Sequence, residues 1–131
     1  MLATPTLLIT DDDAALRESL ATAFTRRGFQ VALAADGKHG LDLARTGGVH
    51  LALVDYQMPK LTGLEMLAQL REIRPELPCI LMSAAMDETL RSEAARMRAY
   101  GVMSKPLRLS EIDKIVRQAM QKYYGWAADP R

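Results

Sequence analysis

Short runs of apolar residues alternate with longer stretches in which apolar residues recur every three or four positions. The short runs predict buried strands, and the longer stretches predict helices with one apolar face. The clearest helix is the last, where the spacing i, i+3, i+4, i+7 is kept by Ile112, Ile115, Val116 and Ala119. The strands are predicted near residues 7–10, 31–33, 50–55, 79–82 and 102–104, with a helix after each, the fourth over about 87–98.

This order of elements predicts an α/β fold. Strands that alternate with helices form a parallel sheet with right-handed crossovers and helices on both faces. We therefore expect a flavodoxin-like, doubly wound sheet of five parallel strands, (βα)5. We expect a single domain over residues 1–131 with a core of about 6–123. The tail, 124–131, is expected to be frayed or to mark a truncation point.

Four of the predicted strands stop at a charged or hydroxyl-bearing residue. The carboxyl ends of parallel strands meet at one edge of a sheet, which is where doubly wound folds bind their ligands. We therefore expect these side chains to form one site. The residues at the four strand ends are Asp11, Asp12 and Asp13, then Asp55, Ser83 and Lys105.

Together these residue types suit a divalent metal and a phosphoryl group. Three carboxylates, Asp11, Asp12 and Asp55, repel one another at close range, and Mg²⁺ (or Mn²⁺) relieves that repulsion with oxygen ligands. Lys105 and Ser83 can then contact phosphoryl oxygens. Asp55 stands alone at the end of a central strand and is the best candidate nucleophile, giving an acyl phosphate.

Each residue also has a simpler reading. Asp12 or Asp13 can cap the following helix, and for Asp13 a cap is the preferred interpretation. Lys105 alone would be an ordinary surface lysine, and Ser83 alone would carry no information. Only their joint placement at the strand ends makes the prediction specific.

Composition and charge narrow the function further. The formal net charge of +1 offers no basic field for nucleic acid. One cysteine, Cys79, excludes an internal disulfide framework and suits a reducing cytoplasm. No stretch approaches the roughly 20 apolar residues that cross a bilayer, and Met1–Pro5 does not begin a secretory signal. We expect a cytoplasmic protein without membrane insertion.

Four segments resemble the receiver domain of two-component response regulators. LLITDDDAALR (7–17) is similar to its acidic pair, and LVDYQMPKLTGLE (53–65) to its phosphoacceptor strand. ILMSA (80–84) is similar to the hydroxyl-bearing strand, and SKPL (104–107) to the lysine–proline turn. The resemblance runs from about residue 6 to 123, nearly the whole chain.

The resemblance implies that a histidine kinase or histidine phosphotransfer protein phosphorylates Asp55. It implies Mg²⁺ held by Asp12, Asp55 and the backbone carbonyl of Gln57, with Asp11 nearby or acting through water, and phosphoryl contacts from Ser83 and Lys105. Such a domain catalyses only its own phosphotransfer and autodephosphorylation. It signals to a downstream protein through the face of its fourth helix, fifth strand and fifth helix. The oligomeric state, a homodimer included, stays open.

The sequence departs from this family mildly at Ser83, where threonine is commoner, and more clearly before Lys105. The family usually carries Tyr or Phe three residues before the lysine, whereas this chain has Val102, with Tyr100 two residues earlier. This departure keeps the first of two alternatives open, and the spacing of Asp11 and Asp13 after a strand keeps the second open. One is a pseudo-receiver that binds partners without phosphorylation. The other is a haloacid-dehalogenase-like phosphatase that uses Asp11 and Asp13.

Overall fold

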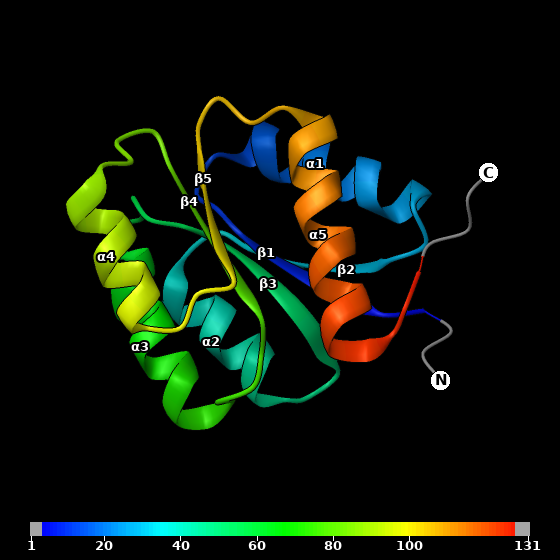
Figure 1. The fold of residues 1–131 in the computed structure, drawn as a ribbon, viewed down its shortest axis with the longest axis horizontal. Helices are drawn as coiled ribbons and strands as arrows, with labels where there is room; N and C mark the ends of the chain where they lie inside the picture. Colours follow the sequence, from blue (N-terminus) through cyan, green and yellow to red (C-terminus); the bar gives the residue numbers. More distant parts are fainter. Residues whose placement is uncertain (1–3, 128–131) are drawn as a thin grey trace.

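The computed structural model describes residues 4–127, and predictions about the first three residues and about 128–131 lie outside this range. Five strands form one parallel sheet in the order β2-β1-β3-β4-β5. Figure 1 shows this sheet between two layers of helices. The strands are β1 (Thr6–Thr10), β2 (Gln30–Ala34), β3 (Val49–Asp55), β4 (Cys79–Ser83) and β5 (Gly101–Ser104).

Each strand is followed by one helix, so the predicted (βα)5 order is confirmed. Helices α1 and α5 cover one face of the sheet and α2, α3 and α4 cover the other, each over its own apolar core. The helices are α1 (Ala14–Arg26), α2 (Gly37–Arg45), α3 (Gly63–Ile73), α4 (Glu88–Arg96) and α5 (Leu109–Tyr124).

The central strands are apolar on both faces because both faces are covered. In β1, Leu7 and Ile9 belong to the core under α1 and α5, while Leu8 belongs to the core under α2, α3 and α4. All three side chains are fully buried. This explains why the strand appears in the sequence as a continuous apolar run rather than as an alternating one.

Side-chain caps begin four of the five helices. Asp13, Asp36, Thr62 and Asp87 each accept a hydrogen bond from the backbone N–H three residues further on. The fourth helix was predicted over about 87–98, but Asp87 is its cap and the helix ends at Arg96. Arg98 has a positive φ of 59°, a left-handed conformation that stops the helix.

The strand order brings the carboxyl ends of β1 and β3 together. The chain leaves β1 toward β2 on one side and returns to β3 on the other, which opens a crevice at the edge where the strands end. Thr10 pairs with Val54, Asp55 with Met82, and Ser83 with Ser104. The residues that follow or end these strands therefore share one edge of the sheet.

The last described residues pack back on the domain at the opposite edge. The Trp126 ring lies 4.9 Å from the Phe29 ring, and the Tyr124 hydroxyl donates to the His50 carbonyl at 2.7 Å. His50 Nδ1 accepts from the Thr6 N–H at 2.9 Å, which joins the starts of β1 and β3. Among residues 4–127, no helix is both long enough and apolar enough to span a bilayer.

Candidate functional site

Polar residues are buried at the carboxyl ends of the central strands. Asp11 and Ser83 are fully buried, and Asp55 is 3% exposed. Burying such groups without partners is unfavourable, so each of them needs a hydrogen bond or an opposite charge. The partners come from the neighbouring strand ends.

Lys105 links two of these carboxylates. Its Nζ lies 2.9 Å from Asp11 Oδ2 and 3.2 Å from Asp55 Oδ1, and its side chain is only 18% exposed. Burial opposes the charge on Lys105, but its hydrogen bond to Asp11 and the two nearby carboxylates outweigh burial and raise its pKa. The ammonium is therefore held in its charged form at the centre of the site.

Asp11, Asp12 and Asp55 form a group of oxygen ligands. One carboxylate oxygen from each lies within 4.8 Å of the other two. Lys105 pairs with only two of them, Asp11 and Asp55, so negative charge is in excess, and the all-oxygen donor set suits a hard divalent cation such as Mg²⁺. Asp12 is exposed, which leaves the group open to solvent on one side.

The pKa of Asp55 reflects this excess of negative charge. Burial first, and then the charge of Asp11, raise its pKa from 3.8 to about 6, even though Lys105 and the Gln57 backbone lower it. A cation beside Asp55 would relieve the same repulsion. The site thus favours either a proton or a metal ion near this carboxylate.

The turn after β1 fixes the acidic pair. The Asp13 backbone N–H donates to Asp11 Oδ1 at 2.9 Å, and Arg17 Nη1 donates to the Asp11 carbonyl at 2.6 Å. The sequence did not reveal Arg17, because an arginine on a helix surface carries no signal of its own. Asp13 accepts from the Leu16 N–H as the cap of α1, so the preferred interpretation of Asp13 is confirmed.

The hydroxyl of Ser83 lies at the end of β4. Its Oγ accepts from the Ala85 N–H at 3.0 Å, and its carbonyl accepts from the Lys105 N–H at 2.9 Å. The second bond ties the ends of β4 and β5 together, next to the cis peptide bond between Lys105 and Pro106. Ser83 and Lys105 are thus neighbours at the edge that holds the carboxylates.

Gly63 keeps the segment after Asp55 close to the sheet. A Cβ atom at this position would lie 2.5 Å from the Asp55 carbonyl oxygen and 2.8 Å from the Tyr56 Cα. The Gly63 N–H donates to the Tyr56 carbonyl at 2.8 Å. Only glycine allows α3 to begin this close to the end of β3. Gln57 lies in the loop between them and is exposed.

The model of the response regulator receiver domain family matches residues 7–117. This chain belongs to that family. The match covers all four strand ends described above, and it ends within α5.

Curated relatives of this receiver domain are longer proteins. It is 30% identical over 118 residues to response regulator RR06 of Streptococcus pneumoniae, covering 90% of this chain and 54% of the relative. It is 40% identical over 109 residues to the transcriptional activator protein PfeR of Pseudomonas aeruginosa, covering 83% of this chain and 35% of that protein. The receiver domain therefore spans about half, or less, of these relatives.

Solved structures agree with the fold. The receiver domain of the Francisella response regulator 1452 has a TM-score of 0.85 and 27% identity, covering 90% of this chain and 98% of that one. CheY in the CheX–CheY–BeF₃–Mg²⁺ complex of Borrelia burgdorferi has a TM-score of 0.83 and 25% identity, covering 88% and 89%.

The receiver domain differs from the expected pattern at β5. Val102 is half-buried against the core under α2, α3 and α4. Tyr100 does not take its place, since its ring lies 5.9 Å from the Tyr123 ring at the end of α5. Tyr100 precedes β5, at the edge of the sheet away from Ser83. Among the described residues, no aromatic ring of β5 stands near the site.

Replacing Asp55 by asparagine is expected to stabilise the metal-free protein in a pH-dependent way. The folded state holds the Asp55 proton more tightly than the unfolded chain does, because the folded pKa is raised from 3.8 to about 6. Wild-type stability from this group is therefore present below pH 4 and lost as pH rises to about 6. In EDTA, the melting temperature of Asp55→Asn minus that of the wild type should grow by a few degrees across this window.

Asp36→Asn is the matched control. The His39 backbone N–H lowers the pKa of Asp36, so its carboxylate favours folding as pH rises, and asparagine keeps the helix cap. Because this pKa lies below 3.8, Asp36 is already ionised above pH 4, so the melting-temperature difference of Asp36→Asn should stay nearly constant between pH 4 and pH 7. A difference for Asp55→Asn that stays flat between pH 4 and pH 7 would contradict the account of the buried charge.

Proposed function

We propose that this receiver domain accepts a phosphoryl group on Asp55 from a histidine kinase or a histidine phosphotransfer protein, with Mg²⁺ (or Mn²⁺), and acts as a conformational switch. The observation that carries the proposal is the buried pair of carboxylates, Asp11 and Asp55, held by one ammonium, Lys105. The similar CheY of Borrelia burgdorferi, which was solved in a complex with BeF₃ and Mg²⁺, supports the same chemistry.

Asp55 is the proposed nucleophile. A carboxylate oxygen of Asp55 attacks the phosphorus of a phosphohistidine, the new O–P bond forms, and the P–N bond breaks. The electron pair of that bond stays on the imidazole, which takes up a proton. Water later hydrolyses the acyl phosphate and restores the carboxylate. These steps act on the domain itself, so we do not propose an enzyme with a separate substrate.

Asp55 and its neighbours are also the proposed metal site. Asp12, Asp55 and the Gln57 carbonyl would hold the ion, with Asp11 bound through water. The group of three carboxylates supports this assignment, since its oxygens converge within 4.8 Å. When bound, Mg²⁺ screens the negative charge of the carboxylates and of the phosphoryl oxygens.

Lys105 and Ser83 are the proposed phosphoryl contacts. Lys105 Nζ already lies 3.2 Å from Asp55 Oδ1, so a phosphoryl group on Asp55 would meet the ammonium with little rearrangement. Ser83 Oγ now accepts from the Ala85 N–H. Donating to a phosphoryl oxygen would redirect this hydroxyl and pull on the segment that leads into α4. A local change at Asp55 would thereby move a helix that lies away from the site.

The output surface is proposed to be the face formed by α4, β5 and α5. Because Val102 presents no ring, the change at Ser83 would reach this face through the β4–α4 segment rather than through an aromatic side chain on β5.

We propose that the downstream partner is a protein and that the domain works in the cytoplasm beside its phosphodonor. We also propose that residues 1–131 form one receiver domain.

The geometry does not favour a phosphatase that uses Asp11 and Asp13. Asp13 is occupied as the cap of α1, and Asp11 is fully buried and paired with Lys105. A pseudo-receiver without phosphorylation is not favoured either, since Asp55, Lys105 and the acidic pair converge at one strand edge.

Incubation with acetyl phosphate and Mg²⁺ tests the proposed chemistry. Intact mass spectrometry should detect the addition of one phosphoryl group, because a small phosphodonor can replace the kinase at a site that carries its own catalytic groups. The gain should vanish in EDTA and in Asp55→Asn, whereas Asp42→Asn, a surface carboxylate paired with Arg45, should behave like the wild type. A gain that persists in Asp55→Asn would overturn the assignment.

Beryllofluoride, a phosphoryl mimic, tests the proposed coupling. In the presence of Mg²⁺, the backbone amide NMR signals of residues 83–96 should shift, because Ser83 Oγ leaves the Ala85 N–H. Ser83→Ala should bind the mimic but lose most of these shifts. If the amides of α4 keep their positions in the wild type, the coupling through Ser83 is wrong.

A further inference from the structure

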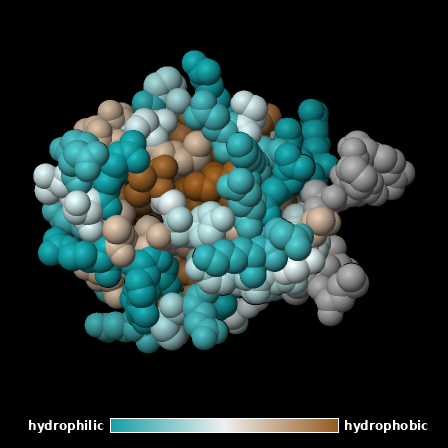
Figure 2. Space-filling view, in the orientation of Figure 1, coloured by the Kyte–Doolittle hydropathy of each residue, from teal (hydrophilic) through white to brown (hydrophobic). Residues whose placement is uncertain are grey.

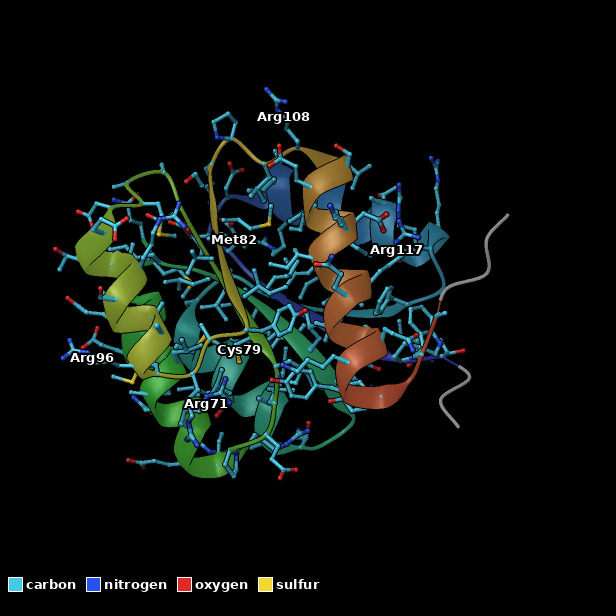
Figure 3. All side chains as sticks on the ribbon, viewed as in Figure 1. Arg71, Cys79, Met82, Arg96, Arg108 and Arg117 are labelled. Atoms are coloured by element: carbon cyan, nitrogen blue, oxygen red, sulfur yellow. The ribbon has the colours of Figure 1, made fainter. Side chains whose placement is uncertain are left out.

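A hollow lies at the edge of the sheet opposite to Asp55. It has a volume of about 870 Å³, within the range of small-molecule sites. Figure 3 shows Arg71 beyond Cys79, at the end of β4 away from Met82. We call this hollow the basic hollow, and its walls are Arg71, Ile73, Arg74, Pro75, Glu76, Leu77, Arg98, Lys122, Tyr123 and Tyr124.

The walls of the basic hollow carry four cations and one carboxylate, Glu76. This imbalance stands out in a chain whose formal net charge is only +1. Low-dielectric walls concentrate the field of like charges in a concave site. The basic hollow is therefore electrostatically prepared for an anion.

Backbone carbonyls fix two of the four cations. Arg71 donates to the Met97 and Leu77 carbonyls, both at 2.8 Å. Arg74 donates to the Ala44 and Val49 carbonyls at 3.2 and 2.9 Å. These bonds hold the guanidinium groups in place without a carboxylate. Their formal charge is therefore not cancelled, although most of their donors are used.

The other two cations, Arg98 and Lys122, keep their donors available. Neither of them is among the ion pairs formed within residues 4–127. Lys122 Nζ lies 5.8 Å and 5.7 Å from the ring centroids of Tyr100 and Tyr123. This contact positions the ammonium beside the basic hollow without neutralising it.

An aromatic surface lies beside these free cations. The Tyr123 side chain is 43% exposed, and Tyr124 also lines the basic hollow. Arginine and lysine are the usual partners of phosphate groups, and an exposed ring offers a flat surface to a base. Cations and a ring within one hollow of this size match a ligand that carries both phosphates and a planar ring.

We propose that the basic hollow binds a phosphorylated nucleoside. Its phosphates would contact Arg98 and Lys122 within the field of Arg71 and Arg74, and its base would pack against Tyr123. The binding involves no covalent step. It does not depend on phosphorylation of Asp55, because the basic hollow and the carboxylates lie at opposite edges of the sheet.

Isothermal titration with ADP in EDTA tests the proposal, since EDTA removes any metal that could recruit ADP to the carboxylates. ADP should bind with a dissociation constant of about 100 µM or tighter. Adenosine and inorganic pyrophosphate should each bind at least about tenfold weaker, a loss of at least 1.4 kcal/mol, because each fills only part of the basic hollow. Absence of binding at about 1 mM ADP would overturn the proposal. Pyrophosphate binding as tightly as ADP would overturn the assignment to a nucleoside.

Charge reversal locates the site. Arg98→Glu and Lys122→Glu should each weaken ADP binding at least about tenfold. Arg96→Glu is the matched control, since Arg96 is an exposed arginine on α4 that does not line the basic hollow. Its affinity should stay within about twofold of the wild type, which separates direct contact from the general field. An equal loss in Arg96→Glu and Arg98→Glu would overturn the proposed site. Thermal unfolding confirms that each variant is folded.

Discussion

The charge balance around Lys105 is the constraint on which the edge of the sheet that holds Asp55 depends. One ammonium holds Asp11 and Asp55, two carboxylates that are almost fully buried, at 2.9 and 3.2 Å. With Asp12 beside them, negative charge remains in excess. An arrangement selected for stability alone would pair these charges one to one or replace them with apolar residues. The uncompensated negative charge favours a cation at this edge, beside Asp55, the proposed nucleophile.

The sheet supplies the precision that this balance needs. Parallel pairing of β1, β3, β4 and β5 brings four strand ends to one edge, and the change of chain direction beside β1 opens that edge to solvent. Local bonds then set the side chains, as when Arg17 holds the carbonyl of Asp11 and the Ala85 N–H holds the hydroxyl of Ser83. The surface in Figure 2 is mainly hydrophilic around a central apolar patch, so the visible face is not uniformly polar.

The apolar runs and their polar ends were enough to predict the order of elements, the parallel sheet and the meeting of the acidic strand ends. These features follow from periodicity, which is local in the sequence. The role of Arg17 and the position of Tyr100 depend on contacts between elements and leave no periodic signal. The basic hollow could not be predicted from the sequence for the same reason, because its cations come from the end of α3, the turn after α4 and the end of α5. The sequence predicted the end of α4 two residues too late, because the left-handed conformation of Arg98 cannot be recognised from its residue type.

The two edges of the sheet thus differ in charge, with carboxylates at one and cations at the other. At the first edge, we propose that Asp55 alone among several neighbouring carboxylates acts as the nucleophile. The most direct test is to locate the phosphoryl group after reaction with acetyl phosphate, by borohydride reduction of the acyl phosphate and tandem mass spectrometry of the peptides. Modification of Asp55 alone is the expected result. Modification of Asp11, Asp12 or Asp13 would contradict the claim.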